Sequence, residues 1–174
     1  MKKYNFIIIF FIILITSNIS YSQNIVIADL DKIVKSSETG KKIITYFSEE
    51  NKKLLDEFKI NENKFKKKER TLISQKNLLS AEEYLKKVDE LKKEVNNFNI
   101  DSNIKLKELN NFKNKILRLF RNEINKILQE FSEKNKIDLI ISSEQILIGK
   151  SNIDVTNDLL NIVNKKITNF EIKK

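Results

Sequence analysis

The side chains that could do chemistry in this chain are carboxylates and amines. Its 174 residues include no His and no Cys, so there is no imidazole for acid–base catalysis and no thiol nucleophile. The usual ligands of soft and borderline metals are missing as well. Paired carboxylates could still act together, but they need a cleft. The apolar spacing described below predicts a thin pair of helices, which offers none. We therefore predict no catalytic residues, no metal ligands, no cofactor and no enzyme activity.

Basic side chains gather in one segment and could attract anions. The chain has 33 Lys and Arg against 24 Asp and Glu, and long-range attraction of this kind weakens as salt is added. The alternative is a solvated helix face in a Lys-biased chain. Nucleic acid is not expected as a partner, because only three basic residues are Arg and no recognition motif is present. The candidate basic patch comprises Lys64, Lys66, Lys67, Lys68, Arg70, Lys86 and Lys87.

The N-terminal segment has the pattern of a secretory signal peptide. Lys2 and Lys3 precede an apolar run over residues 6–15, and a polar stretch follows. Small residues at Ser20 and Ser22 predict cleavage after Ser22. An uncleaved anchor is the alternative, but the run is well short of the roughly 20 residues that a spanning helix needs. The mature chain, residues 23–174, would keep 31 basic and 24 acidic side chains, a net charge of +7.

Most of the mature chain has the pattern of long helices. The whole stretch between Gly40 and Gly149 contains neither Gly nor Pro, and apolar residues recur there at helical spacing. The seam, the line of side chains through which two such helices would pack, becomes more polar along the first helix. One heptad position holds Ile44, Asn51, Phe58, Phe65, Leu72 and Leu79, and its partner holds Phe47, Leu54, Asn61, Lys68 and Gln75.

A turn is predicted near Leu79, because the residues that follow it form a capping box. The Ser80 hydroxyl can accept from the Glu83 amide while the Glu83 carboxylate reaches back to the Ser80 amide. The apolar stripe of the returning helix is Tyr84, Val88, Leu91, Val95, Phe98, polar Ser102 and Lys105, Leu109, Phe112, Ile116, Leu119, Phe120, Ile124, Ile127, Leu128 and Phe131.

Folding the chain back at residues 79 and 80 predicts which side chains face each other. Phe47 would lie near Phe112, and Ile44 near Ile116. The sequence thus predicts an antiparallel helical hairpin over residues 41–135, projecting roughly 60 Å at a rise of about 1.5 Å per residue. Its base would be apolar and firm, and its outer half compliant.

The two ends of the mature chain, residues 23–40 and 136–174, predict a small body. Residues 25–30 and 137–142 are short β-branched runs typical of strands, and residues 146–148 would form a third strand in a small β-hairpin. Residues 36–40 are interpreted as a linker. A terminal helix, with Asp154 or Thr156 as its N-cap, would cover the sheet.

Such a body is too small to be stable alone. It consists of two short segments with no Cys for a disulfide and no expected metal, and its strands are apolar on both faces, so self-association is the expected remedy. The predicted oligomer interface comprises Ile25, Val26, Ile27, Leu139, Ile140, Ile141, Ile146 and Ile148.

Several apolar residues of the predicted hairpin lie off its seam. A helix with one partner cannot bury them, so they are either weak, interchangeable contacts for a binding partner or ordinary scattered surface residues. These candidates are Ile60, Ile73, Leu78, Leu85, Ile100 and Ile104.

Taken together, these segments resemble the Skp (OmpH-like) periplasmic chaperones. The likeness rests on the signal peptide, Ile25 to Asp29, Ser36 to Lys41, the charged hairpin, residues 137–141, and Asp154 to Thr156 before an apolar helix. It implies a mainly α fold with a small β body, and a homotrimer whose helical arms enclose unfolded outer-membrane proteins without ATP. The chain has no GxxxxGK[ST] phosphate loop, which agrees. In the periplasm, the basic patch could also attract lipopolysaccharide or an anionic membrane surface.

A different class of function is also compatible with a long hairpin. An exported coiled-coil spacer, or an envelope adaptor for one folded partner, would have a seam that is uniformly apolar along its length. The predicted seam of this chain becomes more polar along the first helix. This favours the chaperone, which would hold many partners through weak contacts.

Overall fold

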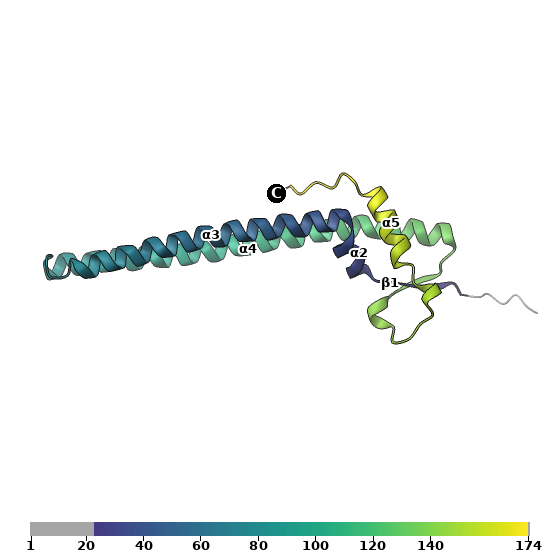
Figure 1. The fold of residues 1–174 in the computed structure, drawn as a ribbon, viewed down its shortest axis with the longest axis horizontal. Coiled ribbons are helices and arrows are strands. Elements are labelled where there is room, and N and C mark those ends of the chain that lie inside the picture. The colour runs from purple at the N-terminus through teal and green to yellow at the C-terminus, as the bar shows by residue number, and fades with distance from the viewer. Residues whose placement is uncertain (1–22, 174) are drawn as a thin grey trace, which may run out of the picture.

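The computed structural model describes residues 23–173, and the predicted signal peptide lies outside the described residues. Two long antiparallel helices project from a small group of short elements at one end of the molecule (Figure 1). The predicted fold class, a mainly α protein with a helical hairpin on a small β body, is confirmed. In chain order the elements are β1 (Ile25–Ala28), α2 (Leu30–Ser36), α3 (Glu38–Ser74), α4 (Ala81–Asn135), β2 (Leu139–Ser142), the 3-10 turns η1 (Ser143–Gln145) and η2 (Ser151–Ile153), and α5 (Thr156–Lys166).

The hairpin turns over residues 75–80, and the predicted capping box starts its second helix. The Glu83 amide donates to the Ser80 hydroxyl at 3.3 Å, and the Ser80 amide donates to the Glu83 carboxylate at 3.1 Å. Hydrogen bonds from the Ser80 hydroxyl and amide lower the pKa of Glu83. The turn therefore satisfies two of the amide groups that a helix N-terminus leaves without partners.

The predicted pairing of the two helices is correct at Phe47 and Phe112, whose ring centroids lie 5.2 Å apart. The seam nearby differs from the predicted heptads. Ile43 is buried at 1% exposure while Ile44 is 45% exposed, and Asn51 is exposed as well. The inward positions here are spaced by four and three residues, as in a straight helix, because α2 and α5 pack on this end from other directions.

Two positions of the predicted stripe on α4 are also wrong. Lys105 and Leu119 are exposed, and Leu106 faces the seam in place of Lys105. A helix period of 3.6 residues moves a strict heptad off the seam by about 20° per repeat, so a one-position shift accumulates over this length.

Among the described residues the sheet has two strands, which are parallel. Ile25 pairs with Leu139 and Ala28 with Ser142, so the hairpin itself is the crossover between the strands. The predicted β-hairpin is therefore wrong. The Ile146–Ile148 segment forms no strand, and Leu147 and Ile148 are 101% and 94% exposed. β1 takes the place beside β2, while the chain after β2 leaves the sheet through η1.

The other edge of β1 is held by the segment before α5. The Val155 amide donates to the Ile27 carbonyl at 3.0 Å, beside a parallel bridge between Ile27 and Asp154. The Asp29 amide donates to the Thr156 hydroxyl at 2.9 Å. The N-cap of α5 is Val155, so the predicted N-caps, Asp154 and Thr156, are both wrong. Asp154 instead accepts from the Thr156 amide at 2.9 Å, and hydrogen bonds from Thr156 lower its pKa.

The predicted linker at residues 36–40 is a sharp corner between two helices. Asp29 caps α2, a helix that the sequence analysis missed, and Ser37 caps α3 by accepting from the Gly40 amide at 3.1 Å. A Cβ on Gly40 would lie 1.6 Å from the carbonyl oxygen of Val34. Glycine is required here because the backbones of α2 and α3 approach so closely.

The hydrophobic core lies at one end of the molecule, here called the root: α2, α5, both strands and the adjoining ends of α3 and α4. Phe47 and Phe112 are the core residues farthest out along the hairpin. Beyond them, within the described residues, Phe58 is the one buried hydrophobic side chain. The core comprises Ala28, Ile33, Val34, Ile43, Phe47, Phe112, Ile116, Phe120, Ile124, Ile127, Leu159 and Val163.

Candidate functional site

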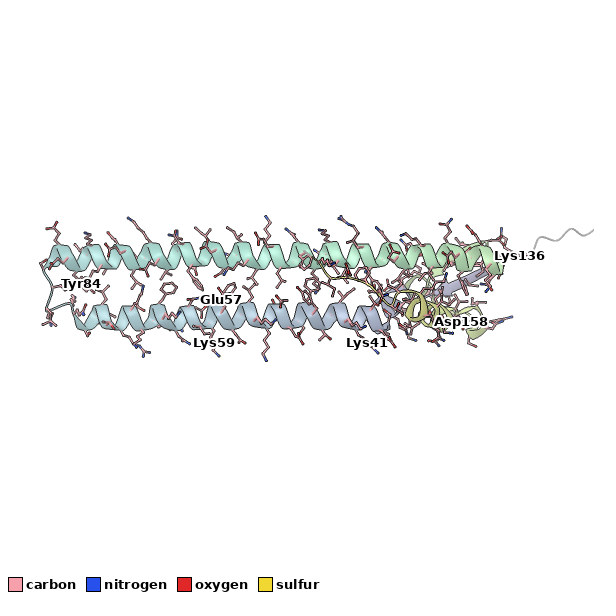
Figure 2. The ribbon with its side chains drawn as sticks, turned by 90° about the horizontal axis from the view of Figure 1, so that it is seen from above. Lys41, Glu57, Lys59, Tyr84, Lys136 and Asp158 are labelled. Atoms are coloured by element: carbon pink, nitrogen blue, oxygen red, sulfur yellow. The ribbon has the colours of Figure 1, made fainter. Side chains whose placement is uncertain are left out.

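The part of the hairpin beyond the core, residues 51–109, is here called the arm. Its two helices run side by side to the tip in both views (Figures 1 and 2). They touch through a thin line of aromatic and aliphatic side chains, in which the Phe98 ring packs against Phe58 at 5.9 Å and Phe65 at 5.3 Å between centroids. Most of these side chains are half-buried. The arm therefore keeps much of its apolar surface in contact with water.

One face of the arm carries an apolar groove of about 760 Å³, here called the apolar groove. Its charged lining is balanced, with Glu62 and Glu69 from α3 beside Lys66 and Lys92. A groove of this size between helices is within the range of small-ligand sites and could receive side chains of an extended polypeptide. Its apolar lining is Phe65, Leu72, Ile73, Tyr84, Val88, Leu91, Val95 and Phe98.

The opposite side of the seam carries a second groove of about 480 Å³, here called the basic groove. The two grooves share Leu72 and Leu91, so they lie back to back across the seam. The structure brings together Lys64, Lys67, Lys68 and Lys87 of the predicted basic patch to line the basic groove with Glu90 and Glu94.

The remaining basic candidates lie elsewhere. Lys66 lines the apolar groove, whereas Arg70 and Lys86 are exposed and line neither. The predicted patch is thus divided between two faces of the arm, because neighbouring residues on a helix point about 100° apart.

Two ion pairs join the helices on the side of the basic groove. Lys68 pairs with Glu94 at 2.5 Å, and Lys105 pairs with Glu57 at 2.7 Å. All four side chains are about half exposed, so each pair contributes only ~0.2–1 kcal/mol. These pairs contribute to the register between α3 and α4 more than to the stability of the arm.

Between the two ion pairs, the seam contains polar residues. Asn61 and Ser102 line a cavity of about 330 Å³ together with Phe58 and Phe98. The Ser102 hydroxyl oxygen is buried and has no hydrogen-bond partner among the described residues. A polar group without a partner lowers the stability of the contact between two helices. The two helices of the arm are therefore held together most weakly at its middle.

The off-seam apolar candidates are all strongly exposed. They are distributed along both helices from the middle of the arm to its turn, and none belongs to the root core. Ile73 lines the apolar groove and Ile104 the mid-arm cavity. Their exposed fractions are Ile60 57%, Ile73 59%, Leu78 83%, Leu85 62%, Ile100 49% and Ile104 49%.

The predicted interface residues of the root differ widely in exposure. Val26 is buried, and Ile27, Ile140, Ile141 and Ile146 are half-buried. The exposed members are Ile25 at 37%, Leu139 at 51% and Ile148 at 94%, and the missed residue Leu147 is fully exposed beside Ile148. Within residues 23–173 the sheet ends at β2, whose outer edge faces no further strand.

Sequence reasoning missed the part of the chain after α5. Residues 167–173 run back along the hairpin from α5 in an extended conformation (Figure 1). Ile167, Phe170 and Ile172 pack against the root core, with the Phe170 ring 5.4 Å from Phe120. The one sign of this segment in the sequence was the irregular spacing of the apolar residues after Lys166.

The described residues contain no cluster of acidic, His or Cys side chains able to hold a metal ion. Across residues 23–173, no helix combines the length and the apolar character that crossing a membrane requires.

The structure thus consists of a helical-hairpin arm, grooved on two faces and attached to a small root of short helices and two strands. The comparisons identify the family. The model of the family described as "Outer membrane protein (OmpH-like)" matches residues 24–163, and the chain belongs to this family. The predicted resemblance is thereby confirmed.

A solved structure supports the same fold. It is the crystal structure of a protein from Caulobacter crescentus CB15 described as a candidate outer membrane chaperone (OmpH-like). The two structures match with a TM-score of 0.80 at 15% sequence identity, covering 86% of this chain and 89% of the other. A comparison with curated proteins found no significant match.

Proposed function

We propose that this protein is an outer-membrane chaperone that acts as an ATP-independent holdase. It would be exported to the periplasm by its signal peptide, bind unfolded outer-membrane proteins, here called clients, and prevent their aggregation. Family membership and the fold shared with the Caulobacter protein support a chaperone role.

The observation that carries the proposal is the contrast between root and arm. The buried core ends at Phe47 and Phe112, while the arm beyond exposes aliphatic side chains and grooves on two faces. A spacer would need a continuous, well-buried seam to keep its length and stiffness. A holdase needs many weak, interchangeable contacts, because its affinity comes from their number.

Client contact is proposed for the six exposed arm residues, Ile60, Ile73, Leu78, Leu85, Ile100 and Ile104. The strands of a membrane barrel alternate apolar and polar residues, so an unfolded client would offer apolar side chains at many places. The basic groove would add attraction for acidic client segments. It could also attract lipopolysaccharide or an anionic membrane surface, since Lys64, Lys67 and Lys87 each contribute a charge there.

We also propose that the protein is a homotrimer assembled through the root. The support is a sheet of two strands whose β2 edge has no neighbour among the described residues, with Leu139, Leu147 and Ile148 exposed nearby. An edge with apolar side chains tends to pair with another chain. Three copies would place three arms around one client and multiply the number of contacts.

The test is a client-holding assay with the mature protein. A urea-unfolded eight-stranded outer-membrane barrel is diluted into buffer at low salt, and aggregation is followed by light scattering. We expect the protein to keep the barrel soluble, and expect the combined variant Ile60→Ser, Ile73→Ser and Leu85→Ser to do so poorly while its unfolding midpoint is unchanged. Full aggregation in the presence of the unaltered protein would reject the proposal.

The trimer is tested separately by sedimentation velocity with and without the barrel. Leu139→Arg places a charge at the exposed end of β2 and should shift the protein toward monomer. Leu85→Arg is the matched control on the arm and should leave the mass of the client-free protein unchanged. A monomeric or filamentous unaltered protein would contradict the trimer.

A further inference from the structure

The segment from Ile167 to Lys173, here called the tail, contacts the root core without belonging to a helix or a strand. α5 ends at Lys166, and the family match ends earlier still, at residue 163. The tail passes over the hairpin near the root in both views (Figures 1 and 2).

The tail lies on the same face of the hairpin as the basic groove. The Thr39 hydroxyl of α3 donates to the Ile167 carbonyl at 2.7 Å. Glu57 follows Thr39 by a whole number of helical turns, so both residues share one face of α3. Glu57 lines the mid-arm cavity, and Lys64 and Lys68, farther along the same face, line the basic groove. The tail thus lies on the side of the hairpin that carries the basic groove, at its root end.

The contacts of the tail are few and can break without disturbing any regular element. The Ile167 amide donates to the Val163 carbonyl at the end of α5. Among the described residues, the bond from Thr39 is the one other hydrogen bond between the tail and a helix or strand. No backbone–backbone hydrogen bond involves residues 168–173. Ile167, Phe170 and Ile172 are each half-buried. Glu171 and Lys173 pair with each other rather than with the arm. Ordering an extended segment opposes this limited burial, so the tail can leave the surface without loss of a helix or a strand.

The side chains of the tail have the pattern of a client strand. Phe170 and Ile172 are two residues apart, which places them on the same side of an extended chain, while Asn169 and Glu171 between and beside them are exposed. Aromatic and aliphatic residues at alternate positions are what the strands of a membrane barrel present. The surface beneath, formed around Phe120, therefore already accommodates a segment of that chemistry.

We propose that the tail is an intramolecular competitor of the client: it fills the root end of the basic-groove face and is displaced by an extended segment with aromatic and aliphatic residues at alternate positions. This inference rests on the proposed function. An empty protein keeps the Phe120 surface covered. A client with a matching segment gains that surface as an additional contact next to the root, where the arm is most rigid.

The experiment compares the full-length mature protein with a variant that ends at Lys166. The probe is a fluorescent peptide with the sequence of residues 167–174, and its binding is followed by anisotropy. We expect the shortened protein to bind the peptide at least about tenfold more tightly than the full-length protein, because the covalently attached tail competes at a high effective concentration. A peptide with Ala in place of Phe170 and Ile172 should not bind. Equal binding to both proteins, or binding to neither, would overturn the proposal.

A full-length variant guards against misfolding of the shortened chain. Phe170→Ala weakens the tail in place, and Asn169→Ala is the matched control at an exposed neighbouring position. The Phe170 variant should bind the peptide and the unfolded barrel more tightly than the control, at unchanged helix content. Weaker barrel binding by this variant would show that the tail only stabilises the root.

A second measurement follows displacement directly. The chain has no Cys, so Lys173→Cys carries a single fluorophore on the tail, and its emission should change when the unfolded barrel is added. An unchanged emission while light scattering shows the barrel held soluble would reject the tail proposal and leave the chaperone intact. Peptide binding by the shortened protein, with no protection of the barrel by either form, would reject the chaperone instead.

Discussion

Replacement of Gly40 by Ala should destabilise the root, although the same change in a helix interior normally stabilises by roughly 0.5–1 kcal/mol. The new methyl carbon would lie 1.6 Å from the Val34 carbonyl oxygen and 2.8 Å from the Ser37 hydroxyl. The nearer atom belongs to the backbone, so no rotamer change can relieve the contact. α2 would have to move away from α3.

The magnitude follows from what that movement exposes. Ile33 and Val34 are buried at 0% and 6% exposure, and burying such side chains contributes ~1.5–3 kcal/mol each. Losing about half of that burial, together with the Ser37 cap at about 1 kcal/mol, outweighs the gain in helix propensity. We expect a net loss of about 2–3 kcal/mol in the free energy of unfolding.

The assay is urea unfolding followed by far-UV circular dichroism at one fixed protein concentration, because association also affects the midpoint. Gly149→Ala is the matched control, since its Cβ would meet nothing closer than 3.5 Å. That variant should be neutral or stabilised by up to ~1 kcal/mol. If Gly40→Ala is as stable as the unaltered protein, the close approach of α2 and α3 is not a constraint and the reasoning fails.

The remaining predictions concern the arm, the root and pH. Ser80→Ala removes the hydroxyl of the capping box and should weaken the tip by about 1 kcal/mol. Amide hydrogen exchange should then speed up near residues 75–84 and stay unchanged in the root. Phe120→Ala, at a fully buried position, should reduce the free energy of unfolding by ~3–5 kcal/mol. Phe98→Ala, at a half-buried seam position, should reduce it much less and accelerate exchange only in the arm, and equal losses would contradict a firm root and a compliant arm. The pKa of Asp154 is held below its ordinary value of 3.8 by hydrogen bonds from Thr156, so its stabilising contribution is present above pH 3.8 and is lost as the pH falls through the lower folded pKa. Asp154→Asn should therefore flatten the acid side of the stability curve measured by urea unfolding, and an unchanged curve would show that this carboxylate has no such role.

The helical hairpin could be predicted from the sequence because its signals are local and repeated. The absence of Gly and Pro between Gly40 and Gly149, together with the heptad spacing, indicated two helices. Ser80 and Glu83 marked the start of the second helix. Once the turn was placed, antiparallel pairing followed from geometry, and the Phe47–Phe112 contact with it.

The errors fall where distant segments decide the structure. The Ile146–Ile148 run is as β-branched as β2, yet it forms no strand: the partner of β2 is β1, from the other end of the chain, and the chain leaves the sheet through η1. Ile43 replaced Ile44 in the core because α2 and α5 pack on the root from outside the hairpin. Heptad spacing alone contains no information about those neighbours.

The candidate site was only partly predictable for the same reason. The exposed apolar residues of the arm were predicted because a helix with one partner cannot bury every side chain. The basic run was divided between two grooves, since side chains on one helix point in different directions. The tail was not foreseen, because an extended segment with three apolar residues has no periodic signal.

The sequence by itself determined the helices, the tip of the hairpin and the exposed character of the arm, since helix propensity, capping and apolar periodicity act between residues a few positions apart. Only the tertiary structure decided which strands pair, why Gly40 is needed and where the tail lies. Two of these features depend on contacts between residues from opposite ends of the chain, such as Ile25 with Leu139 and Thr39 with Ile167. Such contacts form through burial at the root, and local sequence does not specify them.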